Sequence, residues 1–365
     1  MRMKSLIATA AALLILGWLI SIRSHRAVPT SEPATPVATK HSLFPRRPVS
    51  STRVNLQSAE SPAADLSFSN FIALLLKGDA PKLTPDQIES YLSANRRSVE
   101  SLLAAYRIDG DKQFLKEAEE KFPNDPRVAF AAAFKTDSPE ERRHWLDQFK
   151  QSAPDNAMPN YLSARDLFKA GQTSQALQEI AAASGKSTFQ DYSMDFLQAS
   201  EEAYRSAGFS DVQAKGIAST QLLLPHLAEL KQVGVSLGEL AQQYQQAGDD
   251  TSAQGTLQMA LDLGQHLEQP TGWNTVIEGL VGWAVERIAL NAMDPASPYG
   301  ASAQTVQGRL DEIAQQKASI KSTVQSYEAL LGSMSEQDLS AFYDRQKLFG
   351  EIEALRWAHG KYDQK

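Results

Sequence analysis

The chain has 365 residues, of which 42% are hydrophobic and 22% are charged, and its formal net charge is −7. These values are typical of a globular protein with about two domains. Cysteine is absent, which excludes disulfides, thiolate nucleophiles, iron–sulfur clusters and thiolate zinc sites. Residues 1–53 hold eight basic residues and one acid, whereas the remainder carries 28 basic and 42 acidic residues. Because phosphate backbones bind basic surfaces, we expect no nucleic-acid partner for the acidic part.

The first element in chain order is an apolar segment over residues 5–22, which contains no charge. A run of about 18–20 apolar residues is long enough to cross a bilayer as a helix. Trp18 lies near one end, as an interfacial anchor does, and no small-residue cleavage site follows closely. We therefore expect a transmembrane signal-anchor within residues 1–23, with a cleaved signal peptide as the alternative. Short N-terminal tails usually stay inside, so we expect a bacterial inner-membrane protein with its C-terminal domain in the periplasm. Flanking basic residues on both sides leave the orientation open from charge alone.

Residues 24–65 are rich in Pro, Ser, Thr and Ala and show almost no apolar periodicity. Such a composition buries too little apolar surface to order itself, so it predicts a disordered linker. A flexible chain of this length reaches about 35 Å. The globular part would therefore stand away from the membrane.

From residue 66 onwards the pattern is helical, and no alternating β-branched run predicts a strand. A short apolar helix is expected over residues 70–77. Thr84-Pro85 and Gln87 form a capping signature, and the helix they begin should continue to Asp109-Gly110 with one apolar face. Ser138-Pro139 begins another helix in the same way. The whole is expected to be all-α.

Two windows, over residues 157–186 and 234–263, share one ladder of residue types at the same spacing. The ladder consists of Ala164, Leu167, Gly171, Ala176, Ile180 and Ala183, and it recurs as Ala241, Tyr244, Gly248, Ala253, Leu257 and Ala260. Small residues permit close helix crossing, and a glycine ends the first helix. Each window therefore predicts two antiparallel helices joined by a tight turn.

With a Pro-Asp-Asn break at residues 154–156, this ladder resembles the tetratricopeptide repeat, whose helix pairs recur every 34 residues. The two windows lie 77 residues apart, so the resemblance implies an irregular solenoid, expected over residues 66–293. In that family the first helix of each pair lines a peptide-binding groove. Carried over by the ladder, the groove residues are Tyr161, Arg165, Phe168 and Lys169 in one repeat and Gln242, Gln245 and Gln246 in the other. An arbitrary bundle of helical hairpins is the alternative.

Residues 273–291 are apolar almost all round, but Glu278, Glu286 and Arg287 interrupt them, which favours a buried central helix over a second membrane span. After a break, a C-terminal unit is expected over residues 301–360. Its first part has a heptad seam over residues 306–331, and Ser335 begins a further helix. This unit is expected to be an intramolecular hairpin, with a homodimeric coiled coil through residues 304–331 as the alternative.

Catalytic signatures are missing from the sequence. The six histidines are scattered without an H-x-x-x-H pair, and the Gly185-Lys186-Ser187 run has no upstream glycine for a phosphate loop. We therefore expect no enzyme activity, cofactor or metal. An enzyme would need acids or a histidine, for example His144, to meet in the folded chain. The leading hypothesis is a membrane-tethered scaffold that binds a protein or peptide. In that groove, Arg165 and Lys169 would hold a carboxylate above an apolar floor of Tyr161 and Phe168. The alternative is a self-associating envelope protein.

Overall fold

The computed structural model describes residues 66–77, 80–268, 275–300 and 304–362. These residues form helices and only isolated β-bridges, which confirms the all-α class for them. The expected signal-anchor and linker, residues 1–23 and 24–65, lie outside the described residues. Among the described helices, none is both long and apolar enough to cross a bilayer.

The helices before the centre of the chain are α2 (Phe68–Lys77), α3 (Pro85–Ala94), α4 (Val99–Asp109), α5 (Lys112–Lys121), α6 (Pro126–Lys135), α7 (Pro139–Ser152), α8 (Met158–Lys169) and α9 (Thr173–Ser184). They are followed by α10 (Ser193–Ser206), α11 (Asp211–Thr220), α12 (His226–Gln246), α13 (Asp250–Glu268), α14 (Val276–Leu290), α15 (Val306–Gln325), α16 (Tyr327–Ser333), α17 (Glu336–Phe349) and α18 (Glu351–Tyr362).

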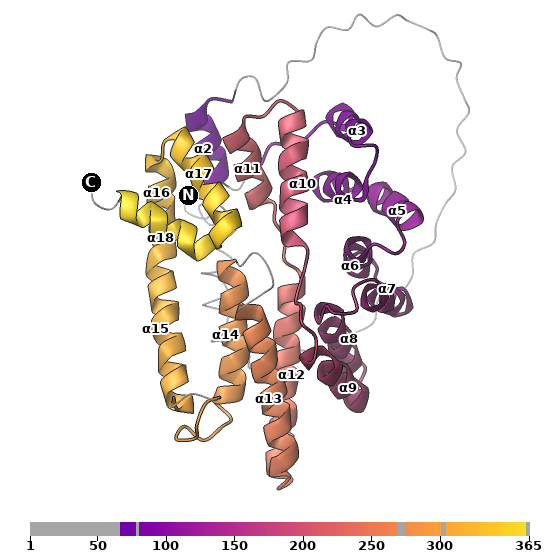
Figure 1. Cartoon of the computed structure of the whole chain (residues 1–365), viewed down its shortest axis with the longest axis vertical. Helices are drawn as coiled ribbons and strands as arrows, with labels where there is room; N and C mark the ends of the chain where they lie inside the picture. The colour runs from indigo at the N-terminus through magenta and orange to yellow at the C-terminus, as the bar shows by residue number, and fades with distance from the viewer. Residues whose placement is uncertain (1–65, 78–79, 269–274, 301–303, 363–365) are drawn as a thin grey trace, which may run out of the picture.

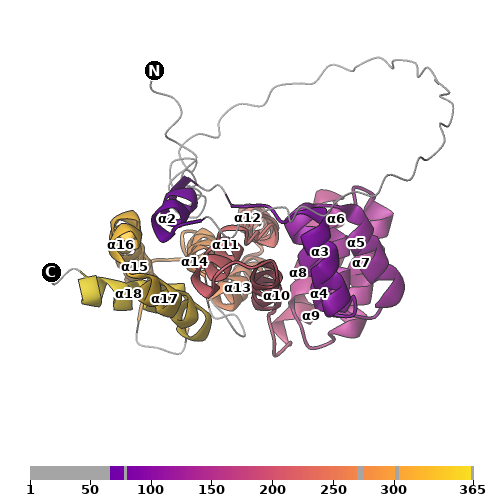
Figure 2. The same cartoon turned by 90° about the horizontal axis from the view of Figure 1, so that it is seen from above.

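The helices form three groups that lie side by side (Figures 1 and 2). Helices α3 to α9 follow one another along one side of the molecule. Helices α10 to α14 occupy the centre, and α15 to α18 lie on the opposite side. Helix α2, although first in the described chain, packs against α11 and α16, so it joins the centre to the C-terminal group.

The two hairpins expected from the ladder are present as α8–α9 and α12–α13. Their turns contain Gly171 and Gly248, whose φ angles of 72° and 75° are in the left-handed region that glycine adopts without strain. The amide following each glycine donates to a carbonyl five residues earlier, which closes the helix end. The alanines of both ladders are buried. Although distant in sequence, the hairpins are neighbours, because α8 packs on α12 and α9 on α13.

The single helix expected from Pro85 to Asp109 is wrong, because the chain turns between α3 and α4. Arg96 and Arg97 have φ angles of 54° and 50°, and Ser98 then caps α4 by accepting from the amide of Ser101. The turn is stabilised by Arg97, whose guanidinium binds Glu89 and Glu117 at 2.7 and 2.5 Å. The apolar periodicity continues across the turn, which is why the sequence did not reveal it. The predicted cap at Thr84 is confirmed, with its capping-box partner Gln87.

Helix α14 is a central buried helix, as expected. It packs on α12, α13 and α15. The approach to α13 is very close: a Cβ built on Gly282 would lie 2.8 Å from the carbonyl oxygen of Gly264. Glycine is therefore required where these two backbones cross.

The C-terminal segment has more breaks than the heptad pattern predicted. Helix α15 ends at Gln325, α16 follows, and Gly350, with a φ of 87°, separates α17 from α18. The seam residues Val306, Ile313 and Ile320 are buried within the chain, where α15 packs on α14 and α18. The expected unit over residues 301–360 is thus four helices rather than one hairpin.

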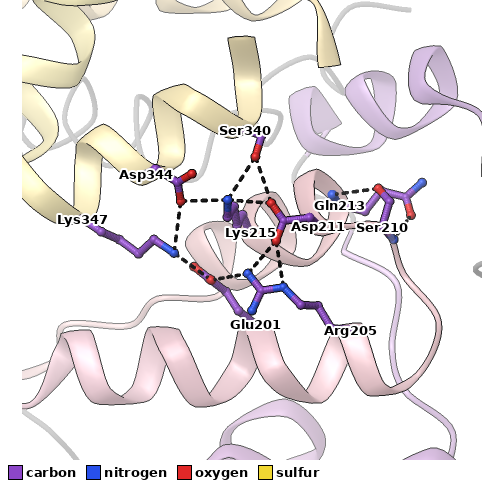
Figure 3. Close-up of polar contacts among 9 residues, drawn as sticks. All are labelled: Glu201, Arg205, Ser210, Asp211, Gln213, Lys215, Ser340, Asp344 and Lys347. Atoms are coloured by element: carbon purple, nitrogen blue, oxygen red, sulfur yellow. Dashed lines mark hydrogen bonds and ion pairs between the residues drawn. The ribbon is translucent and has the colours of Figure 1, made fainter. Parts of the chain in front are cut away.

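A charged network connects the centre to this C-terminal group (Figure 3). The Lys215 ammonium of α11 binds Asp211 at 2.6 Å and Asp344 of α17 at 2.8 Å. Glu201 of α10 is nearly fully buried and binds Lys347 of α17 at 2.8 Å. Because the Lys215–Asp344 and Glu201–Lys347 pairs cross between helices, they fix α17 against α10 and α11.

Candidate functional site

A groove of about 1070 Å³ lies among α7, α8 and α9, next to the start of α12. Most of the residues that line it are polar or charged, from Thr136 to Lys150 on one side and from Asn160 to Ala182 on the other, with Glu229 from α12. Arg165 and Lys169, two of the residues expected in a groove, line it.

Four charged side chains form a fixed cluster in this groove. Arg142 donates from Nε to Asp166 at 2.7 Å and from Nη1 to the carbonyl oxygen of Ala133 at 2.7 Å. Its Nη2 donates to Glu229. Arg165 binds Asp166 at 2.8 Å and lies 4.0 Å from Glu229. Two guanidinium groups thus share two carboxylates contributed by α8 and α12, which holds both arginines in place.

A second set of paired groups continues the lining. The Glu179 carboxylate of α9 binds Lys150 at 2.7 Å and accepts from the amide nitrogen of Asn160 at 2.7 Å. The carbonyl oxygen of that amide is buried and has no hydrogen-bond partner among the described residues. Exchanging the amide's oxygen and nitrogen would place an oxygen against a carboxylate, so the assignment is fixed by chemistry.

Two further cations in the lining are exposed: Arg143 on α7 and Lys169 at the end of α8. Neither makes an ion pair or a side-chain hydrogen bond with another described residue. The other basic residues of the lining, Arg142, Lys150 and Arg165, are all paired with acids. The groove therefore presents two available positive charges and one exposed carboxylate, Asp137, beside a neutralised cluster.

The remaining predicted site residues lie elsewhere. Tyr161 is fully buried; its hydroxyl lies 3.1 Å from Nδ1 of His266, and burial raises its pKa. Phe168 is half-buried against the core and does not line the groove. Neither therefore supplies the apolar floor expected beneath Arg165.

The glutamines of the second ladder do not join the first-ladder residues in the groove. Gln242, Gln245 and Gln246 are exposed near the far end of α12, where Gln245 donates to the carbonyl oxygen of Ala292 at 3.0 Å. A single continuous groove over both ladders, as the resemblance implied, does not form. Instead, α8 and α12 pack on each other.

Sequence reasoning missed the contributions of α7 and α12 to the groove. The adjacent pair Arg142-Arg143, one turn after the Ser138 cap, was a visible signal for a basic stretch near the start of this helix. Glu229 gave no local signal, because it lies 87 residues from Arg142, its partner. Only the packing of α12 on α8 brings it there.

A separate polar cluster is buried in the centre of the molecule, where Asp191, His226 and Glu278 bring one ligand-type atom each to within 4.8 Å of one another. Asp191 precedes α10, His226 begins α12, and Glu278 is in the first turn of α14. Burial and the Asp191 charge raise the pKa of Glu278 to about 8. Burial also opposes ionisation of Asp191, but the contacts with His226 and Ser193 outweigh it and lower the Asp191 pKa. His144, the histidine named from the sequence, is exposed and packs on Trp145 instead.

Comparisons of the chain with protein-family models, with curated proteins and with solved structures find no match. The roles of the groove and of the buried cluster are therefore inferred from their geometry alone.

Proposed function

We propose that this chain is a scaffold that binds an extended, acidic peptide segment of a partner protein in the groove of α7, α8 and α9. The observation that carries the proposal is the pair of available cations, Arg143 and Lys169, in the lining of this groove. Carboxylates are the ligands that such cations take most readily.

The paired cluster supports this proposal because it keeps the groove open. Arg142 and Arg165 are held by Asp166 and Glu229, so the groove does not depend on a ligand to order its walls. A preformed site loses less side-chain entropy on binding than a mobile one. Arg143 and Lys169 remain free to contact the ligand.

The strength of binding should be modest and sensitive to salt. Exposed ion pairs contribute about 0.2–1 kcal/mol each. Screening also weakens them as ionic strength rises. We therefore expect the apolar and backbone contacts of the peptide to supply part of the affinity, with the two cations selecting for acidic sequences.

The finer description of the scaffold is also a proposal. The two ladder hairpins support a tetratricopeptide-like repeat, and the sequence of residues 1–65 supports an anchor and a tether. Anchored in a bacterial inner membrane, a periplasmic domain on such a tether would search a shell around its anchor for its partner. Enzyme activity is not part of the proposal.

A displayed library of random peptides, selected on the full-length chain in detergent, tests the peptide-binding proposal. We expect enrichment of acidic peptides, and we expect the double variant Arg143→Glu/Lys169→Glu to lose them. The matched control is Lys112→Glu/Lys116→Glu, the same charge change at exposed positions on α5. Equal enrichment on both double variants, or enrichment of peptides without acids, would overturn the proposal.

Self-association through residues 304–331 stays a prediction. The buried seam residues of α15 are already covered within the chain, so a dimer through them would require α15 to leave α14 and α18. Light scattering of the full chain distinguishes a monomer from a dimer.

A further inference from the structure

The buried cluster of Asp191, His226 and Glu278 has a feature that ordinary core polar groups do not have. Both ring nitrogens of His226 are buried and lack a hydrogen-bond partner among the described residues. Nε2 lies 3.1 Å from Oδ2 of Asp191, close enough for an ion pair when the ring is protonated. Buried polar atoms are normally satisfied, and leaving one unsatisfied costs about 1–3 kcal/mol.

An aromatic ring is the neighbour of His226 on one side. Its ring packs edge-on against Phe130, with 5.7 Å between the ring centroids, and only 1% of the residue is exposed. The nearest charged groups are the carboxylates. A cation held between Nε2 and the two carboxylates would use a ring lone pair that nothing else in the described structure uses.

The carboxylates are oriented by contacts that leave them able to coordinate. Asp191 accepts from the backbone amide of Ser193 at 2.9 Å and also from the Ser193 hydroxyl. One oxygen of Glu278, Oε2, accepts from the amide and the hydroxyl of Thr275 at 2.7 and 2.8 Å. Contacts of this kind fix the ligands of a metal site from behind.

The charges around the cluster also favour a cation. A third carboxylate, Glu351, accepts from the amide of Val276 at 2.9 Å, at the start of the helix that carries Glu278. The Arg107 guanidinium, which lies 3.6 Å above the ring centre of Phe196, also acts on Asp191 through its charge. Three carboxyl groups therefore face one imidazole and one arginine.

From this geometry we infer that Asp191, His226 and Glu278 form a binding site for one divalent first-row transition-metal ion, of the zinc or manganese type. Imidazole nitrogen and carboxylate oxygen are the donors that these ions take in proteins. A tetrahedral ion at about 2.0–2.2 Å from each donor holds its donors about 3.3–3.6 Å apart, so the present spacing of at most 4.8 Å must contract by up to about 1.5 Å on binding. The ion would join the segment before α10 to the starts of α12 and α14.

This inference is independent of the peptide groove, since the cluster shares no residue with its lining. It also differs from the expectation drawn from the sequence, which was no metal. The three ligands come from separate segments, so no spacing motif could show them.

The test is metal titration of the full-length chain in detergent after chelation, by calorimetry with Zn²⁺ and with Mn²⁺. We expect one ion per chain and a rise in melting temperature on binding. Co²⁺ should also bind and give a visible absorption band of a site with one nitrogen and several oxygen donors. Several weak, equivalent ions per chain, or no uptake by the wild-type chain, would overturn the inference without any variant.

Variants then assign the ligands. His226→Gln and Glu278→Gln should each weaken binding at least about a hundredfold, since even outer contacts of a metal site are worth about 10–100-fold. The matched control is His266→Gln, which changes a half-buried histidine beside Tyr161 and away from the cluster. Circular dichroism reports whether each variant is folded. Unchanged affinity in a folded His226→Gln chain would remove this site from consideration.

Discussion

The crossing of α13 and α14 allows a sharp test of the fold, because two glycines of α14 differ completely in their surroundings. A Cβ added at Gly282 would lie 2.8 Å from the carbonyl oxygen of Gly264 and 3.2 Å from the amide nitrogen of Glu268. Both are backbone atoms, so the contact cannot be relieved by turning a side chain. A Cβ added at Gly279, one turn earlier, would meet nothing within 4 Å.

The two substitutions should therefore have opposite signs. Overpacking of a core costs about 1–3 kcal/mol, and Gly282→Ala should lose about that much. Gly279→Ala should gain about 0.5–1 kcal/mol, because alanine favours a helix interior over glycine. The expected difference between the two variants is thus about 1.5–4 kcal/mol in the free energy of unfolding.

Urea unfolding of the full chain in detergent, followed by circular dichroism, measures this difference. Gly279→Ala serves as the control for helix propensity, since it makes the same chemical change in the same helix. If Gly282→Ala were as stable as the wild type or more stable, the close backbone crossing of α13 and α14 would be refuted.

Three further predictions concern charge and capping. Glu268 has its pKa raised to about 8 by burial and by Glu286, whereas the unfolded value is 4.5. The folded chain therefore holds the proton that the unfolded chain releases, so the free energy of unfolding should fall as pH rises from about 4.5 to 8. The fall should be smaller in Glu268→Gln. Urea titrations at several pH values measure it, and an equal dependence of stability on pH in the wild type and the variant would contradict the prediction. Lys215→Met should lower the free energy of unfolding by about 1–3 kcal/mol, measured from the urea midpoint, because Asp211 and Asp344 lose their shared cation. The loss is limited because both carboxylates are half-exposed and can be hydrated. Ser335→Ala should lower the free energy of unfolding by about 1 kcal/mol, because α17 loses its N-terminal cap. Ser319→Ala, on the exposed face of α15, should leave the free energy of unfolding unchanged in the same assay.

Much of the local structure was predictable because its causes are local. Thr84, Ser138 and Ser335 cap helices through side-chain oxygens within three residues of the amides they accept from. Gly171 and Gly248 end helices because they adopt left-handed angles. These signals depend on residues close together in the chain, so they can be recognised in the sequence.

The wrong predictions of continuous helices share one physical cause. Apolar spacing continued through residues 95–98, through Ser326 and through Gly350, although the helices break at each place. Periodicity reports which face is buried and does not report whether the helix is continuous. At residues 96 and 97 the break is held by Arg97 and its two carboxylates, which come from other helices.

The sequence by itself determined that this chain is helical, where many of its helices begin and end, and which small residues lie at their crossings. Only the tertiary structure showed which polar and charged residues come together in a candidate site. Glu229 reaches Arg142 only because α12 packs on α8, and His226 meets Asp191 and Glu278 only where three helices begin at one place. Helix starts depend on a few neighbouring residues, whereas a site depends on contacts between segments far apart in the chain, which no local pattern encodes.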